Sequence, residues 1–338
     1  TTNGGTGAAG GINWQQVATG FPVLGVPAIA INPANRNEMY IGTGEVYNTG
    51  APGTGLSGFG ISGQNVRTFR GSYGIGILKS VDGGATWTQS LAFTNSSIKG
   101  VQDIVIDPVS PSNVFAATSD GLYRSTNSGA TWTLIHSVVM AMDICITPGN
   151  AATMYVACGN FGSAGSGIYK STNATSASPT FTQLTSGLPS SASINGMIRL
   201  SICVNNVNLL YASIGKIPGT SGGTAGTTYG LFKTTNAGAT WTAATQPQLS
   251  GANYIQNQGW YSHDVLVGPS GNTVFVSEID MLKSSDGGAS YSQISVWSNW
   301  NFSNTTVGAT SEGTSTNYVH ADHHHLYFSP FDGNYTTV

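Results

Sequence analysis

The stretch Ser80–Trp87, SVDGGATW, recurs along the chain and decides the fold. Each copy follows an alternating apolar run (GILK, GLYR, GIYK, GLFK or DMLK), and polar β-forming residues follow its aromatic. A strand, a tight turn and a second strand of this kind form a β-hairpin. The further copies are STNSGATW at 125–132, TTNAGATW at 234–241, SSDGGASY at 284–291 and a stretched STNATSASPTF at 171–181.

The residue types inside the repeated turn have separate physical roles. A short Asp or Asn side chain accepts hydrogen bonds from backbone N–H groups ahead of it in the turn. Glycine supplies a positive φ angle that other residues resist, and the aromatic residue begins the next strand and buries its ring against the hairpin. We expect a structural role for these positions, namely Asp82, Gly84, Trp87, Asn127, Gly129, Trp132, Asn173, Phe181, Asn236, Gly238, Trp241, Asp286, Gly288 and Tyr291.

The spacing of the turns predicts the architecture. Their aromatic residues are 45, 49, 60 and 50 residues apart, and a four-stranded propeller blade needs about 40–50 residues. We therefore expect an all-β protein, a β-propeller with five complete blades in a single domain, residues 1–338. The first blade is expected at Ala28–Asn32, Glu38–Thr43, Ile75–Ser80 and Thr86–Ser90, and a partial sixth begins at His320–Ser329. Because an open propeller exposes sheet edges, we expect a fragment of a larger protein whose remaining blades or domains are partners of this one.

The pattern S/T-x-D-x-G-x-T-W resembles the Asp-box, or bacterial neuraminidase repeat, of β-propeller proteins, and the likeness covers nearly the whole chain. It is similar to secreted bacterial propellers of the sortilin-like and xyloglucanase-like kinds. The resemblance implies that the turns are structural and lie between the third and fourth strands of each blade, away from the ligand face.

Composition limits the partners. Only 7% of the residues are charged, with 11 Lys and Arg against 14 Asp and Glu, so nothing is basic enough to follow a phosphate backbone and nucleic acid is not expected. No apolar run reaches membrane-spanning length, so membrane insertion is not expected. The three cysteines lack metal-ligand spacing and are expected to be buried free thiols. Few lysines and polar uncharged loops indicate an exported protein, and the resemblance implies a bacterial one, extracellular or on the cell surface.

Five long connections are expected on one face of the propeller. They join second to third strands, or a fourth strand to the next blade, and binding sites tend to lie on such loops. The connections are Glu45–Gly74, Gly159–Ser166, Gly215–Thr228, Gln246–Tyr261 and Trp297–Val319. Their aromatic rings either stack on sugar faces or pin the loops to the propeller. The candidate ligand-binding residues are Tyr47, Trp260, Tyr261, Trp297, Trp300 and Tyr318.

The first strands of the blades can be aligned on the turn that follows each of them. Two neighbouring positions then form rings near the mouth of the propeller, and because they face opposite sides of a strand, only one ring can line the centre. The first ring is Ala28, Asp103, Asp143, Ser201, Asp264 and His325, and the second is Pro27, Gln102, Met142, Leu200, His263 and His324.

A His-rich segment, NYVHADHHHLYF at 317–328, is the densest polar cluster. His320, Asp322 and His324 share one strand face, and imidazole and carboxylate groups two residues apart can coordinate a divalent metal. The same groups can instead form a neutral hydrogen-bonded network. No other cofactor is expected.

Hydrolysis of a glycosidic bond needs two carboxylates about 5–10 Å apart. The candidates are Glu45, in the segment YIGTGEVYNTG at 40–50, with Asp322 or Asp264. Sialidases of this repeat class use three arginines and an Arg-Ile-Pro segment. This chain has only five arginines in all and no Arg-Ile-Pro segment, so sialidase activity is not expected. Xyloglucanase-type hydrolases carry an Asp segment in the first blade, which is GTGEVYN here.

The sequence thus favours a binding or adhesion propeller that recognises a glycan or another extracellular polymer on its aromatic loop face. One alternative is a glycoside hydrolase acting on a β-glucan-type polysaccharide with paired carboxylates. Another is a structural module of a large surface protein.

Overall fold

The computed structural model describes residues 16–22, 25–47, 74–94, 99–216, 229–249, 251–255, 258–297, 319–320 and 322–328. These residues form strands and turns, with no α-helix among them. The strands build five four-stranded antiparallel sheets and one small hairpin. The first two sheets are β1 (Ala28–Ile31), β2 (Met39–Gly42), β3 (Gly76–Ser80) and β4 (Thr88–Ala92), then β5 (Val101–Ile106), β6 (Val114–Thr118), β7 (Gly121–Ser125) and β8 (Thr133–His136).

The remaining sheets follow in chain order, each pairing its four strands consecutively. They are β9 (Ala141–Thr147), β10 (Asn150–Cys158), β11 (Gly167–Ser171) and β12 (Thr182–Leu184); β13 (Ile198–Cys203), β14 (Asn206–Ile214), β15 (Gly230–Thr234) and β16 (Thr242–Ala243); and β19 (Asp264–Val267), β20 (Val274–Ser277), β21 (Met281–Ser284) and β22 (Ser292–Gln293). The hairpin, β17 (Gln248–Leu249) and β18 (Ala252–Asn253), lies within the connection from β16 to β19.

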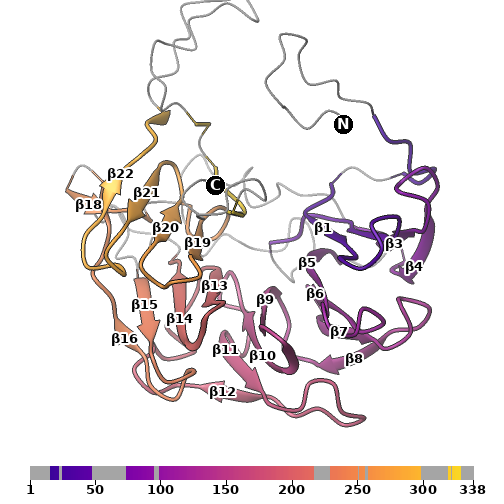
Figure 1. The fold of residues 1–338 in the computed structure, drawn as a ribbon, viewed down its shortest axis with the longest axis horizontal. Coiled ribbons are helices and arrows are strands. Elements are labelled where there is room, and N and C mark those ends of the chain that lie inside the picture. The colour runs from indigo at the N-terminus through magenta and orange to yellow at the C-terminus, as the bar shows by residue number, and fades with distance from the viewer. Residues whose placement is uncertain are drawn as a thin grey trace, which may run out of the picture.

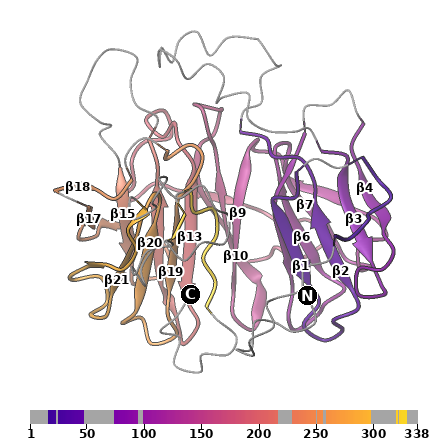
Figure 2. The ribbon, with the colours of Figure 1, turned by 90° about the horizontal axis from the view of Figure 1, so that it is seen from above.

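The sheets are arranged around a centre, with β1, β5, β9, β13 and β19 innermost (Figure 1), and consecutive innermost strands contact each other. Figure 2 shows these strands side by side along the same direction. Four apolar cores fill the spaces between consecutive sheets, as Phe115 of β6 and Met154 of β10 do between the second and third. Second strands such as β6 are therefore buried on both faces and read as continuous apolar runs, whereas outer strands such as β4 are largely exposed. The predicted β-propeller is confirmed.

Residues 322–328 form no strand, although they lie along the fifth sheet. The Leu326 N–H donates to Asp264 Oδ2 at 2.6 Å, and the His323 N–H donates to the Glu278 carbonyl at 3.0 Å. The partial sixth blade and the total number of blades therefore stay predictions. The cysteines Cys145, Cys158 and Cys203 are buried free thiols, as expected.

The repeated turns have the predicted hydrogen bonds. Asp82 Oδ1 accepts from the Thr86 N–H at 2.9 Å, and Ser80 Oγ accepts from the Gly84 N–H at 2.8 Å. The same pairs recur in three more copies, and in the stretched copy Asn173 accepts from the Thr180 N–H at 2.9 Å. The equivalent turn glycines all have positive φ angles: 92° at Gly84, 78° at Gly129, 82° at Gly238 and 82° at Gly288. Burial of the aromatic ring is complete only for Trp241, which belongs to the apolar core between the third and fourth sheets, whereas the other four aromatics are half-buried.

In the first four sheets, the basic residue next to the end of the third strand attaches its sheet to the next repeated turn. Lys79 Nζ donates to the Ser128 carbonyl at 2.6 Å, and Lys170 Nζ donates to the Ala237 carbonyl at 2.7 Å. Arg124 and Lys233 make the same kind of bond. Each of these lysines also lies over a second-strand ring, as Lys79 does 5.3 Å from the centroid of Tyr40. A recurring basic residue thus joins sheets that share no strand pairing.

Gly129 tests the packing of a repeated turn against the neighbouring sheet. Its φ is +78°, and a Cβ there would lie 2.8 Å from Tyr40 Cε1. We expect Gly129→Ala to lower the free energy of unfolding by about 1–2 kcal/mol for the left-handed backbone and about 1–3 kcal/mol for the clash. Gly149→Ala is the control, since Gly149 has φ +73° with nothing within 4 Å. Equal denaturation midpoints for the two variants would contradict this packing.

Candidate functional site

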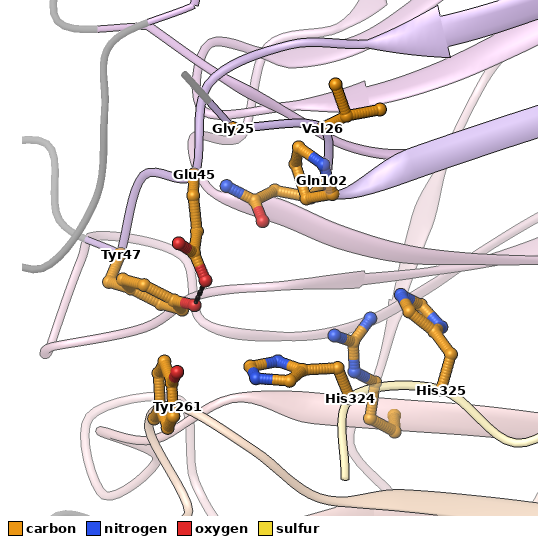
Figure 3. Close-up of a pocket in the computed structure, with 10 residues that line it drawn as sticks. Gly25, Val26, Glu45, Tyr47, Gln102, Tyr261, His324 and His325 are labelled. Atoms are coloured by element: carbon orange, nitrogen blue, oxygen red, sulfur yellow. Dashed lines mark hydrogen bonds between the residues drawn. The ribbon is translucent and has the colours of Figure 1, made fainter. Parts of the chain in front are cut away.

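A cavity of about 290 Å³ lies where the innermost strands begin, and we call it the rim cavity. Segments far apart in the sequence meet there: the residues before β1, those after β2, the starts of β5 and β13, the loop before β19 and the 322–328 segment (Figure 3). Its lining residues are Gly25, Val26, Pro27, Glu45, Tyr47, Gln102, Arg199, Tyr261, His324 and His325. The structure therefore brings together four candidate residues, Glu45, Tyr47, Tyr261 and His324.

Glu45 is held at the rim by its own loop. The Tyr47 hydroxyl donates to Glu45 Oε1, and Figure 3 shows the carboxylate directed toward that hydroxyl. Tyr47 is 4% exposed, and its burial together with the nearby Glu45 charge raises its pKa far above the ordinary value. Gln102 Nε2 donates to the Val46 carbonyl at 2.6 Å, which fixes the loop to β5. The tyrosine stays protonated and remains a donor to the carboxylate.

The rings beside Glu45 form a buried aromatic cluster. The Tyr47 centroid lies 5.5 Å from that of Trp260 and 5.3 Å from that of Tyr261, and Phe161 lies 5.2 Å from Trp260. Tyr261 in turn contacts His324 edge-on at 4.7 Å. Three of the predicted long connections therefore converge on one rim. Trp260 is only 3% exposed, so its ring packs against protein, which favours the pinning role over sugar stacking at this position.

A second cavity, of about 420 Å³, lies at the centre between the innermost strands. Asp103, Asp143, Ser201, Asp264 and His325 of the first predicted ring line this central cavity. Side chains of that ring accept backbone N–H groups of the next inner segment: Asp103 Oδ2 accepts from the Ile144 N–H at 3.0 Å and Asp143 Oδ2 from the Leu200 N–H at 2.6 Å. Ser201 Oγ accepts from the Val267 N–H at 3.0 Å, and Asp264 continues the series to Leu326. Each bond joins one innermost segment to the next.

Burial controls the protonation of these carboxyl groups. It raises the pKa of Asp264 to about 7, with the nearby Arg199 charge acting in the opposite direction. Burial also raises the pKa of Asp103 and of Asp143, and Asp143 adds to the upward shift of Asp103. Several carboxyl groups in one cavity can thus be accommodated near neutral pH because they hold protons more tightly than free aspartate does.

The second ring is divided between the rim cavity and the core. Pro27, Gln102 and His324 border the rim cavity, whereas Met142 and His263 are fully buried. His263 lies in a relay in which Tyr254 OH and Ser213 Oγ are 2.7 Å apart and Ser213 Oγ lies 2.8 Å from His263 Nδ1. Because Nε2 faces the Met197 carbonyl at 3.1 Å, Nε2 carries the proton. Burial lowers the pKa of His263 to about 3, so this ring is neutral and structural.

Other candidate residues lie elsewhere. Trp297 is 42% exposed and lines neither cavity, and its backbone N–H donates to Asp280 Oδ1 at 2.7 Å. Asp264 faces the central cavity, and Asp322 and His320 line neither one. Trp300 and Tyr318 lie outside the described residues.

The predicted metal site is not supported by the geometry of the described residues. Among the residues that the structure describes, no group of three or more His, Cys, Asp and Glu side chains is placed to hold a metal ion. His324 points to the rim cavity and contacts Tyr261. A site of His320, Asp322 and His324 therefore stays a prediction.

Among the polar residues of the rim cavity, Arg199 belongs to none of the predicted sets, whereas Gln102 and His325 belong to the predicted rings. Arg199 interrupts the apolar run of β13, IRLSIC, and is 4% exposed. A charged residue inside an otherwise buried strand is the sequence signal that could have found it, because such residues are rarely fully buried without a reason.

Comparison with solved structures supports the fold. The chain is similar to an ancestral GH74 enzyme (17% identity, TM-score 0.53, covering 86% of this chain and 33% of that one). It is also similar to the GH74 xyloglucanase from Xanthomonas campestris, with 17% identity and a TM-score of 0.52, covering 81% of this chain and 39% of that one. A third similar structure is the extracellular domain of a putative one-component system from B. thetaiotaomicron, with 13% identity and a TM-score of 0.51, covering 83% of this chain and 29% of that one. The chain thus spans about a third of the length of these proteins, and the likeness shows the fold alone.

No family model matches the sequence, and no curated protein matches it. The part of the chain that the structure describes contains no helix of the length and apolar character needed to cross a membrane.

The raised pKa of Asp264 predicts a specific pH dependence of stability. The folded protein binds this proton more tightly than the unfolded chain, so the contribution is complete below pH about 4 and is lost as pH rises through about 7. We expect Asp264→Asn to flatten the fall in unfolding free energy between pH 5 and pH 8, by a few kcal/mol at most, as measured by urea denaturation.

Asp82→Asn is the control for that pH series. Hydrogen bonds from Thr86 lower the pKa of Asp82 to about 2, so its contribution changes only as pH falls below about 4. The chain itself uses Asn at the equivalent position 127. A slope between pH 5 and pH 8 that is the same in wild type and Asp264→Asn would refute the assignment.

The burial of Trp260 predicts an effect on stability. Trp260→Ala should lower the unfolding free energy by about 3–5 kcal/mol, the usual cost of removing a buried large aromatic ring. Trp297→Ala, at a 42% exposed position, should change it by about 0.5 kcal/mol or less. Thermal unfolding of both variants measures the difference, and similar melting temperatures would restore Trp260 as a solvent-facing ring.

Proposed function

We propose that this protein binds carbohydrate in the rim cavity. The observation that carries the proposal is a carboxylate, Glu45, fixed by the Tyr47 hydroxyl in a cavity that also contains a half-buried tyrosine ring and neutral polar groups. A carboxylate accepts hydrogen bonds from sugar hydroxyls, and an aromatic ring packs on the C–H face of a sugar. Tyr261 and Gln102 supply the ring and the neutral polar group.

The size of the cavity suits a small part of a larger ligand. Its volume of about 290 Å³ is at the lower end of ligand pockets, which are about 300–1,000 Å³. A terminal sugar or one ring of a chain fits this space better than several rings together. The exposed Trp297 lies outside it and is available for a longer polymer.

A setting outside the cell belongs to the same proposal. Proteins of similar fold include a xyloglucanase and an extracellular domain, each longer than this chain. We place this propeller in a secreted or surface-bound bacterial protein whose other blades or domains are its partners, and it then serves as a binding or adhesion unit. A purely structural module would leave the rim cavity without a ligand.

Glycoside hydrolysis is the second candidate, favoured by the likeness in fold to GH74 enzymes. Hydrolysis of a β-glucan-type polysaccharide would need a partner carboxylate for Glu45. Among the described residues, Glu45 is the one carboxylate lining the rim cavity, while Asp264 lines the central cavity and Asp322 neither. Binding without cleavage therefore fits the arrangement better.

Glu45→Gln tests the site while keeping an acceptor for the Tyr47 hydroxyl. We expect it to weaken binding to the best ligand of a glycan array by about tenfold, since a hydrogen bond to a charged group contributes about 1.5–3 kcal/mol. The melting temperature should stay the same. Calorimetry measures the affinity, and an assay for new reducing ends measures cleavage.

Asp120→Asn is the matched control, because Asp120 pairs with Lys99 away from the rim cavity. If Glu45→Gln binds the ligand with the same affinity as wild type, Glu45 does not belong to the site. Reducing ends released by wild type and lost in Glu45→Gln would establish the hydrolase instead.

A further inference from the structure

We propose that the rim cavity contains a subsite for the carboxylate of an acidic sugar, a uronic acid, and that Arg199 binds it. This inference rests on the proposed carbohydrate-binding function and names the class of ligand. It starts from a guanidinium group whose hydrogen-bonding capacity is largely unused.

Arg199 has one hydrogen bond among the described residues. Its Nη1 donates to the Met142 carbonyl at 3.0 Å, whereas its Nε is buried without a partner. The residue is 4% exposed and lines the rim cavity. A guanidinium has five N–H donors, and a buried charge is costly unless it is paired and hydrogen-bonded. The side chain is thus desolvated but not satisfied within the described protein.

No acidic side chain pairs with Arg199 in the described part of the chain. The ion pairs found there within 4.0 Å join Lys79 to Glu38 and Lys99 to Asp120. Glu45 shares the rim cavity but bonds to Tyr47. The carboxyl groups of the central cavity accept from backbone N–H groups of neighbouring strands, as Asp143 does from Leu200. Opposite charges therefore line one cavity without neutralising each other.

The chemistry of these two groups defines the ligand. A planar guanidinium binds a carboxylate through two parallel N–H···O bonds, and a carboxylate such as Glu45 accepts from hydroxyl groups. A sugar with both hydroxyl groups and a carboxylate, that is a uronic acid, matches both. Burial lowers the pKa of the neighbouring His324 and His325, which favours their neutral forms. With Glu45 also present, a ligand group with one negative charge is favoured over a phosphate ester, which carries nearly two.

The first test compares two ligands on the wild-type protein. One is an oligouronide, and the other is the same oligosaccharide with its carboxyl groups reduced to primary alcohols. We expect calorimetry to show at least about tenfold tighter binding of the oligouronide, since a charge-assisted pair contributes about 1.5–3 kcal/mol. This comparison needs no variant and so does not depend on how a substitution folds.

The second test uses Arg199→Lys, which keeps the charge but loses the planar fork. It should remove most of the preference for the oligouronide over the reduced oligosaccharide, measured as the ratio of the two affinities. Arg124→Lys is the matched control: Arg124 is 8% exposed and also has a buried Nε without a partner, but it bonds to the Ala174 and Ser176 carbonyls and lines neither cavity. Its preference should equal that of wild type.

Each other outcome overturns a definite statement. Equal binding of both oligosaccharides would refute the acidic subsite and leave carbohydrate binding in place. Absence of binding to either ligand and to a neutral glycan array would refute carbohydrate binding as well. Tighter binding of a sulfated or phosphorylated oligosaccharide would replace the carboxylate with that anion, and a preference retained in Arg199→Lys would remove Arg199 from the site.

Discussion

Side chains join the sheets of this propeller, because the strand ladders end at the edge of each four-stranded sheet and only single backbone bonds, such as Val101 N–H to the Thr43 carbonyl, cross between the first two. On the inside, Asp103, Asp143, Ser201 and Asp264 each accept a backbone N–H from the next innermost segment. Toward the outside, basic residues such as Lys79 donate to a carbonyl of the next repeated turn. The apolar cores supply the buried apolar area between consecutive sheets, and these hydrogen bonds fix how one sheet is aligned with the next.

The inner bonds have an electrostatic consequence that shapes the site. Three of the four use a carboxyl group at the centre, and burial raises the pKa of these groups, as it does for Asp264. Arg199 is close enough to lower the pKa of all three aspartates, yet it forms no ion pair with them among the described residues. The acidic centre is thus explained by the architecture, while Glu45 and Arg199 at the rim are explained by neither the strands nor the turns.

How far the sequence predicts this structure depends on the distance over which an interaction acts. Four of the five repeated turns depend on residues within four positions of each other, as Asp82 and Thr86 are, so the ends of the first-blade strands were predictable to within two residues. The aromatic cluster joins Tyr47 to Trp260 across most of the chain, and no local pattern reveals that Trp260 is buried. The first strand of a sixth blade was predicted at 320–329, but residues 322–328 bond to Asp264 of β19 and to the Glu278 carbonyl and form no strand.

A fold of this kind can place charges at its rim only at a cost in stability, and the cost differs between the two unexplained residues. Glu45 has the Tyr47 hydroxyl as a donor, so its burial is partly compensated. Arg199 is more deeply buried and has one carbonyl for five donors. Local rules that favour a unique fold are commonly broken at functional positions. Since Arg124, which is also buried, meets two carbonyls in a structural contact, the unmet donors of Arg199 favour the rim cavity over the repeated turns as the proposed ligand site.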